Sequence, residues 1–404
     1  MYTPRALRWR LLMREKNRGR WGWVPNQAEG VRKLIARLGP ADRLRVCYEA
    51  GQCGFVLYWQ LQQMGVHCSV IAPSLIPRRS GERVKTDRLD ALRLVRSYRA
   101  GELVAVLVPS KEQEALRDLL RAIYSAKGDQ IRHVHRLAKF LLRQGRCKPP
   151  GVGLLSTKYL AWARAQQFAQ PAQREVLNHY VLEFEHSSQR SELTKALDEV
   201  CEQLAKPTAA LVAALQGLRG VAKLLALSLV SELGNLSRFR NPRPLMSYAG
   251  VVSREHSSGN TIRRGAITKS GRGHLRRMIV EAAWHYRHRP GLGQALAKRQ
   301  AGLSEEVRAI AWKAQLRLTR RYRQLVLRGK PKPQVIVAVA RELLGFIWAI
   351  GMRVEEERKL VLVAQPLARN KDPGRRAASR PDSRLRVSRP QPPRSAITAP
   401  SSRG

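Results

Sequence analysis

The sequence predicts an α/β domain followed by a mostly helical chain. Between residues 43 and 109, short runs with strand-like alternation or β-branched residues take turns with segments of helical spacing. From Ser110 to about Gln216 almost every segment has helical spacing, and residues 217–352 form a further, compact and mostly helical unit. Because alternation of strands with helices is typical of α/β folds, we assign that class to the first segment only.

Each element of the α/β segment depends on a local pattern. The first strand alternates with period two, and the other two are short and β-branched, whereas the helices place apolar residues three and four positions apart. The predicted strands cover residues 44–48, 67–72 and 103–108, and the predicted helices cover residues 55–64 and 87–98.

The helical part predicts a long connector, a helical domain and a tail. Two apolar faces in the connector indicate a helical hairpin or coiled coil: Leu116, Leu119, Leu120 and Ile123, then Leu193, Leu197, Val200 and Leu204. The last helix, residues 334–352, carries Arg341 and Glu342, so we expect a core helix and not a membrane span. Residues 364–404 hold seven prolines and a charge of +8, which predicts a disordered basic tail.

The charge of the chain predicts a polyanionic partner. The sequence has 404 residues with 75 Lys and Arg against 30 Asp and Glu, a formal net charge of +45, which excludes most ordinary metabolic enzymes. An anionic membrane surface is the alternative, but no run of about 18 uncharged apolar residues exists to cross a bilayer, so nucleic acid is the leading interpretation. The five cysteines form no Cys-x-x-Cys pair, which indicates a reduced, intracellular protein without structural zinc.

Three acidic residues form the first candidate site. Glu49 follows the first predicted strand, at a position where catalytic groups collect in α/β folds. Asp87 and Asp90 lie three residues apart, which places both carboxylates on one helix face about 5–6 Å from each other. Such a pair suits Mg²⁺, whose ligands are oxygens. The simpler alternative is that both acids stabilise the first turn of a helix.

A segment rich in small, hydroxylated and basic residues forms the second candidate site. Ser257 and Ser258 lie in a loop bounded by glycine, and a serine hydroxyl among arginines can attack a phosphodiester. The simpler alternative is a flexible loop that only contacts backbone phosphates. We predict DNA or RNA binding by Arg263, Arg264, Lys269, Arg272, Arg276 and Arg277, and by the backbone at Gly220, which precedes an apolar helix. An ordinary helix–turn–helix connection at Gly220 is an equal alternative.

Together these motifs resemble the transposases of insertion-sequence family 110, in particular its 1111 subgroup. The resemblance covers residues 24–352 and depends on Tyr48-Glu49-Ala50, Lys85-Thr86-Asp87-Arg88-Leu89-Asp90-Ala91, Ser247-Tyr248-Ala249-Gly250, His256-Ser257-Ser258-Gly259, Gly265-Ala266-Ile267-Thr268-Lys269-Ser270-Gly271 and His274-Leu275-Arg276-Arg277. It implies a RuvC-like domain of the ribonuclease H class with an Asp-Glu-Asp-Asp set, a helical connector and a C-terminal domain with a nucleophilic serine.

The resemblance also implies roles and partners. Glu49, Asp87 and Asp90 correspond to the second, third and fourth acids of the set and would bind Mg²⁺, and Ser258 would attack DNA to form a 5′-phosphoserine. A structured guide RNA encoded by the element, the bridge RNA, would specify the transposon ends and target DNA. The protein would work as a homo-oligomer, a dimer or tetramer with shared active sites, in the bacterial cytoplasm at the nucleoid and with no membrane.

The start of the chain departs from the family pattern. Family members begin with a strand that carries the first aspartate, whereas residues 1–23 contain no Asp and, by our interpretation, no strand. We therefore expect domains at 1–23 (atypical basic start), 24–110 (incomplete RuvC-like), 111–216 (connector), 217–355 (serine domain) and 364–404 (tail). The chain is then wrongly started or a degraded, nucleic-acid-binding copy with impaired cleavage; a metal-dependent junction nuclease without serine chemistry is a further alternative.

Overall fold

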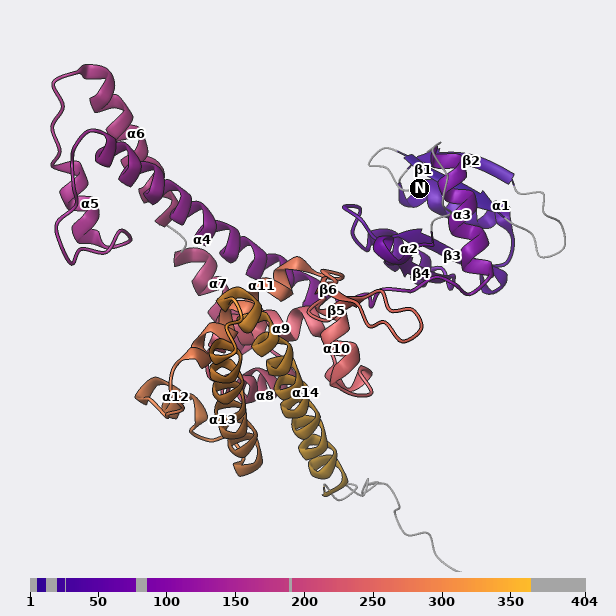
Figure 1. The fold of residues 1–404 in the computed structure, drawn as a ribbon. Coiled ribbons are helices and arrows are strands. Elements are labelled where there is room, and N and C mark those ends of the chain that lie inside the picture. The colour runs from indigo at the N-terminus through magenta and orange to yellow at the C-terminus, as the bar shows by residue number, and fades with distance from the viewer. Residues whose placement is uncertain (1–5, 12–19, 26, 78–85, 189–190, 365–404) are drawn as a thin grey trace, which may run out of the picture. The chain divides into compact units, whose positions relative to one another are not determined.

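The computed structural model describes residues 6–11, 20–25, 27–77, 86–188 and 191–364 (Figure 1). Lys85 of the acidic motif and residues 365–404 of the predicted tail lie outside the described residues. The N-terminal elements are β1 (Ala6–Leu11), β2 (Arg20–Pro25), α1 (Ala28–Leu38), β3 (Arg45–Glu49), α2 (Val56–Gln63), β4 (His67–Ile71) and α3 (Asp87–Arg99). The strands and helices predicted from residue 44 to residue 98 are therefore confirmed, each to within one or two residues.

Our expectation that residues 1–23 contain no strand is wrong. β1 and β2 pair antiparallel over six positions, from Ala6 opposite Pro25 to Leu11 opposite Arg20. Their sequences alternate: Leu7, Trp9 and Leu11 are separated by arginines, and Trp21 and Trp23 by a glycine. An alternation with period two is the signal of a strand, and the high arginine content concealed it.

β3 and β4 form the parallel pair of the α/β domain. Their register places Val46 opposite Cys68 and Tyr48 opposite Val70. The apolar core beneath them receives buried side chains from α1 and α2: Val31, Ile35, Leu57 and Leu61. Glu49 is the last residue of β3, so its position at a strand end is confirmed.

The strand predicted at residues 103–108 is reduced to a single bridge. Ala105 pairs antiparallel with Ile71, since Val106 donates to the Val70 carbonyl at 2.8 Å and Ala72 donates to the Val104 carbonyl at 3.0 Å. The β-branched run is there, but its pairing with β4 does not extend beyond these two hydrogen bonds, so the prediction of a full strand is wrong.

The connector consists of α4 (Lys111–Arg143), α5 (Thr157–Arg164), α6 (Pro171–Ser188), α7 (Ser191–Glu202) and α8 (Lys206–Leu215). Ser110 begins α4 with a capping box, in which its hydroxyl accepts from the Gln113 amide and the Gln113 side chain accepts in return from the Ser110 amide. α4 packs along α6, as a helical hairpin requires (Figure 1). Their shared core contains Val134, Leu137, Phe140, Leu141, Leu177, Val181 and Phe184.

The C-terminal helices form a large apolar core. They are α9 (Lys223–Leu233), α10 (Pro242–Tyr248), α11 (Gly273–Ala283), α12 (Gln294–Gln300), α13 (Glu305–Leu327) and α14 (Lys332–Ala364), and the short strands β5 (Ser253–Glu255) and β6 (Arg264–Ile267) lie between α10 and α11. Leu116, Leu120 and Leu197 of the connector contribute to the same core, so this core extends across residue 216.

α14 is a core helix, as the sequence predicts. Among the described residues, it is the one helix whose length and composition would allow it to cross a membrane. Its positions Val335, Ile336, Val339, Leu343, Leu344, Ile347 and Ile350 are almost fully buried in the protein core. Its residue Glu342 is paired, because the carboxylate accepts from Arg317 at 2.9 Å and contacts Arg321 at 3.3 Å.

Candidate functional site

Ser258 lies at the tip of an exposed hairpin. β5 and β6 pair antiparallel with an irregular register, and the segment between them closes on a turn in which Ser258 and Thr261 exchange backbone hydrogen bonds of 3.2 and 3.1 Å. Gly259 takes the first central position with a φ of +55°, which a tight hairpin turn of two residues favours and which suits glycine. Every residue from Ser253 to Ala266 is exposed, so the hairpin presents the serine to solvent.

The two neighbouring serines differ in what their hydroxyls bind. The Ser257 hydroxyl donates to Glu255 Oε1 at 2.9 Å and accepts from the Arg263 amide at 3.3 Å, so it braces the hairpin. The described residues offer no hydrogen-bond partner to the Ser258 hydroxyl, which is exposed. Of the two, only Ser258 therefore has its oxygen available for an incoming phosphate.

Close contact between two backbone segments fixes the base of the hairpin. Residues 248–252 and 268–271 lie against each other, with Thr268 donating to the Val252 carbonyl at 2.8 Å and Lys269 donating to the Gly250 carbonyl at 3.1 Å. At Gly271 (φ +67°) an added Cβ would clash with the Tyr248 carbonyl oxygen. This position must therefore remain glycine for the two segments to meet.

Two of the predicted phosphate-binding arginines make internal contacts. Arg276 Nη1 donates to the carbonyls of Ala249 at 3.2 Å and Ser270 at 3.0 Å, which ties together the two segments at the hairpin base. Arg272, the residue before α11, contacts Glu232 at 3.2 Å. These two side chains therefore stabilise the base of the hairpin, and the Arg272 side chain remains partly exposed to solvent.

Glu232 is the centre of a buried charge cluster that sequence reasoning missed. Its side chain is 2% exposed, and it meets Arg121 at 2.7 Å, Arg272 at 3.2 Å and Arg117 at 4.0 Å. Arg117 is also buried and donates to the backbone carbonyls of Ser231 at 2.6 Å and Glu232 at 3.3 Å. The available signal was a single carboxylate inside the mostly apolar helix α9, whose other polar residues are Lys223 and two serines.

The other predicted basic residues remain on the surface. Arg263 and Lys269 are exposed and have no acidic partner among the described residues. Arg264 pairs with Glu255 at 3.4 Å, and Arg277 pairs with Glu281 at 3.7 Å, both as exposed ion pairs. Since exposed pairs are weak, all four residues are able to bind phosphate.

An aromatic pair continues the site along α11. The rings of Tyr124 and His274 meet edge to face at 4.8 Å, and the Arg277 guanidinium lies 5.9 Å from the Tyr124 ring centroid. Burial lowers the pKa of His274, and the nearby charge of Arg277 lowers this pKa further. His274 therefore favours the neutral form and adds no fixed charge to the site.

The structure does not gather the three predicted acids into a metal centre. Glu49 ends β3 and is exposed, whereas Asp87 and Asp90 lie in the first turn of α3, where the Thr86 hydroxyl accepts from the Leu89 amide. Asp90 is 14% exposed and contacts Arg93 at 3.4 Å. Within the described ranges no three His, Cys, Asp or Glu side chains are placed to hold a metal ion. The residues present thus do not fit a complete ion site.

Gly220 has a packing role. Its φ is +83°, and an added Cβ would meet the Ala282 carbonyl oxygen at 2.6 Å and the His285 ring at 2.9 Å. The glycine thus lets the turn before α9 approach the end of α11, which agrees with an ordinary connection between helices.

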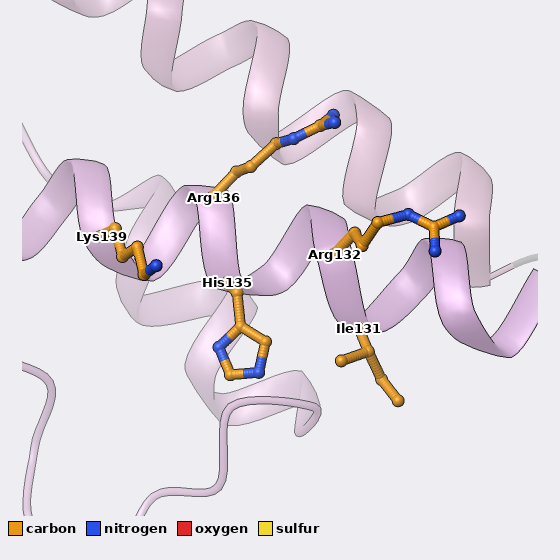
Figure 2. Close-up of a pocket in the computed structure, with 5 residues that line it drawn as sticks. All are labelled: Ile131, Arg132, His135, Arg136 and Lys139. Carbon is orange, nitrogen blue, oxygen red and sulfur yellow. The ribbon is translucent and has the colours of Figure 1, made fainter. Parts of the chain in front are cut away.

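A hollow of about 490 Å³ on α4 is lined by Ile131, Arg132, His135, Arg136 and Lys139. Figure 2 shows these side chains leaving the helix in different directions. Arg132 pairs with Asp129, and Arg136 lies 3.5 Å from Glu183. Because acids already neutralise two of its four basic residues, this hollow is a weaker phosphate site than the serine hairpin.

Comparison with known proteins decides the family. Transposase y4qE of Sinorhizobium fredii is 42% identical over 337 residues, which cover 83% of each chain. The transposase for insertion sequence element IS1533 of Leptospira borgpetersenii is 32% identical over 73% of this chain and 86% of its own length. The transposase for IS1111A of Coxiella burnetii is 24% identical over 59% of this chain and 65% of its own. Two models of the IS110 transposases also match the sequence. This chain belongs to the IS110 family of transposases.

Two family profiles divide the IS110 chain in the same way as the candidate sites. The profile described as "Transposase IS116/IS110/IS902 family" matches residues 212–297 and contains the serine hairpin, and the IS110 DEDD transposase profile matches residues 11–144 and contains all three acids. The second match begins before Val24, where we expected the resemblance to start. That expectation is therefore wrong, and β2 is part of the IS110 domain.

Proposed function

We propose that this insertion-sequence transposase cuts and rejoins DNA with Ser258 as the nucleophile. One observation carries the proposal: Ser258 stands at the tip of an exposed hairpin with an unengaged hydroxyl, while the hydroxyl of Ser257 is bound within the hairpin. Arg263 and Lys269, exposed and unpaired among the described residues, would hold the phosphate.

The proposed step is a phosphoryl transfer to serine. Ser258 Oγ forms a bond to phosphorus as the P–O3′ bond of the DNA breaks, which leaves a 5′-phosphoserine and a free 3′-hydroxyl. The serine proton is lost to solvent, and the departing 3′ oxygen takes one up. Rejoining reverses the step with the 3′-hydroxyl of another strand, so the energy of the phosphodiester is kept in the covalent link.

DNA and RNA partners complete the proposal. The basic face suits the transposon ends and the target DNA, and a structured bridge RNA encoded by the element would select them. The active unit would be a homo-oligomer that works on chromosomal DNA in the cytoplasm. The charge of +45 supports these partners, because binding both DNA and RNA needs phosphate contacts beyond those of one hairpin.

The acidic residues enter the proposal in a restricted way. A DEDD domain is typically metal-dependent, and a bound ion such as Mg²⁺ would stabilise charge on the reacting phosphate. Glu49, Asp87 and Asp90 are the predicted ligands, but within the described ranges they do not form a complete ion site, so no metal enters the proposed step. The same observation favours a second candidate function, a nucleic-acid-binding copy with impaired cleavage.

The test is a covalent adduct assay on DNA that contains the transposon ends. The full-length protein and its cognate RNA are incubated with end-labelled DNA, and protein–DNA adducts are separated under denaturing conditions. We expect Ser258→Ala to abolish the adduct and the matched Ser257→Ala to retain most of it. An adduct that persists in Ser258→Ala would contradict the assigned nucleophile, and binding without any adduct in the wild type would favour the impaired copy.

A further inference from the structure

The solvent face of α13 carries large apolar side chains. Trp312 is 45% exposed and Leu316 is 48% exposed, and one helical turn separates them. The opposite face of α13 is already used, because Val307, Ala311, Ala314 and Leu318 are buried in the C-terminal core. Trp312 and Leu316 are therefore not needed for this core, and a contiguous exposed apolar patch commonly marks a binding surface.

A loop beside α13 extends this apolar surface. Two buried side chains of α13 hold the loop: Thr319 donates to the His288 carbonyl at 3.3 Å, and Gln315 accepts from the Gly291 amide at 3.1 Å. Leu292 of the loop is exposed and borders the same hollow as Trp312. The hollow has a volume of about 390 Å³ and is also lined by Gln300, Glu305, Arg308 and Ala309. Trp312 thus forms one wall of an open site built from two elements.

The charges around this site are mostly positive. Arg308, Lys313, Arg320 and Arg323 of α13 are exposed and make no ion pair with the described residues, in contrast to Arg317, which pairs with Glu342. The loop adds the exposed residues Arg287 and Arg289. Glu305 is the one acid among the lining residues. A partner for this surface must therefore supply negative charge together with flat apolar groups.

We propose that the α13 face binds an unpaired strand of nucleic acid. Bases would stack against Trp312 and Leu292 in the hollow, and phosphates would lie on Arg308 and the neighbouring basic residues. Unpaired bases offer π-faces beside a phosphate chain, which matches this combination of an aromatic ring and free arginines. A second copy of the chain that met this surface with its own α13 face would bring the same positive charge and be repelled.

The α13 site is distinct from the serine hairpin. It rests on the proposed function in one respect, because that function supplies the unpaired strand. Cutting and rejoining DNA under the guidance of an RNA exposes unpaired segments, either displaced DNA or RNA loops. The two nucleic acids share the chemistry that the α13 face recognises, and RNA and DNA probes of equal length distinguish them.

The experiment measures binding of the full-length protein to fluorescein-labelled oligo-dT, oligo-U and a duplex of mixed sequence by fluorescence anisotropy. We expect Trp312→Ala to weaken binding to the single strands about tenfold and binding to the duplex less than twofold. Trp312→Phe keeps an aromatic face and should restore most of the affinity. Leu182→Ala, a change of an exposed apolar residue on α6, is the matched surface control and should have no effect.

A second variant keeps the test independent of the tryptophan. Arg308→Ala should lower the slope of log affinity against log salt by about 0.7 on the single strands, which corresponds to the loss of one phosphate contact. Unchanged single-strand binding in both variants would overturn the proposal. Equal losses of affinity for the duplex and for the single strands would overturn it too. A change of oligomeric state in Trp312→Ala with unchanged binding would also overturn it, because that result would indicate an interface between copies.

The two proposals fail separately. If Ser258→Ala abolishes the adduct while Trp312→Ala leaves single-strand binding unchanged, the serine chemistry stands and the α13 site is wrong. If the wild type forms no adduct but single-strand binding depends on Trp312, the α13 site stands and the serine chemistry is wrong.

Discussion

The buried carboxylate of Glu232 should be among the most sensitive positions in the serine domain. It lies on α9 and compensates Arg117 and Arg121 of α4 and Arg272 at the start of α11. Replacement by glutamine keeps the volume of the side chain and removes its charge. The perturbation therefore leaves three arginines without the carboxylate they share, and one of them, Arg272, directly follows the segment that carries the serine hairpin.

The magnitude follows from the burial of each partner. Removing one partner of a buried ion pair costs about 3–5 kcal/mol, because the other charge is left without compensation. Arg121 and Arg272 are 43% and 37% exposed and regain water, and Arg117 keeps its two bonds to backbone carbonyls. We therefore take the lower end, about 3 kcal/mol, which is on the order of a hundredfold in the unfolding equilibrium.

Urea unfolding, followed by far-ultraviolet circular dichroism, measures this loss as a lower midpoint at an unchanged slope. Glu342→Gln is the matched control: Glu342 also joins two arginines, but it is 16% exposed, and its partners Arg317 and Arg321 are 58% and 35% exposed, so none is as buried as Arg117. It should cost about 1 kcal/mol or less. Equal midpoints for Glu232→Gln and Glu342→Gln would refute the reasoning that burial decides the cost.

Three further predictions concern the hairpin, a histidine and the thiols. Gly271→Ala should destabilise the protein by about 3 kcal/mol in the same urea assay, because the position has a positive φ and the new Cβ would clash with the backbone. Gly259→Ala has the same sign of φ but no atom near the new Cβ, so it should cost only about 1 kcal/mol. Similar values for the two variants would contradict the clash. Burial lowers the pKa of His274 in the folded state, so the unfolded chain binds this proton more readily, and stability should fall as the pH drops through the ordinary value of 6.5. The urea midpoint should therefore decrease between about pH 7.5 and about pH 5.5, and it should decrease less in His274→Gln. An equal decrease in both proteins would exclude His274 as a cause. Burial raises the pKa of Cys47 to about 12, so a thiol reagent at mildly alkaline pH should label exposed Cys147 first and reach Cys47 only in urea, as mass spectrometry of the labelled peptides can check.

Local periodicity predicted most of the fold, and it failed where composition or pairing distance interfered. The alternation from Leu44 to Tyr48 and the helical spacing after Phe55 were sufficient, because each is decided by neighbours within one or two turns. The same alternation was present in β1, but its arginines looked like a solvated or foreign segment. Residues 103–108 failed for another reason, since pairing over a long distance in sequence decides whether a β-branched run becomes a strand.

The sequence predicted the chemistry of the candidate site, but it did not predict which of its side chains are bound within the protein and which are free. A serine among glycines and arginines marked residues 256–277, and the structure places them on one hairpin and the helix after it. The family resemblance singled out Ser258, but no local pattern in the sequence shows that the Ser257 hydroxyl is bound within the hairpin, because that contact depends on the register between β5 and β6. The partner of Arg272 was equally hidden, since Glu232 lies forty residues earlier on another helix.

Charge alone therefore overstates how many phosphates the serine domain binds. Three arginines use their guanidinium groups to bind Glu232 and backbone carbonyls: Arg117, Arg272 and Arg276. These groups stabilise the scaffold and are less available to a ligand. Arg263 and Lys269 have no such commitment among the described residues. Because counterion release counts only phosphates that are newly contacted, the salt dependence of binding at the hairpin should follow the free cations and not the total. The buried and half-buried arginines stabilise the scaffold that positions Ser258, and we expect the exposed Arg263 and Lys269 to make the phosphate contacts.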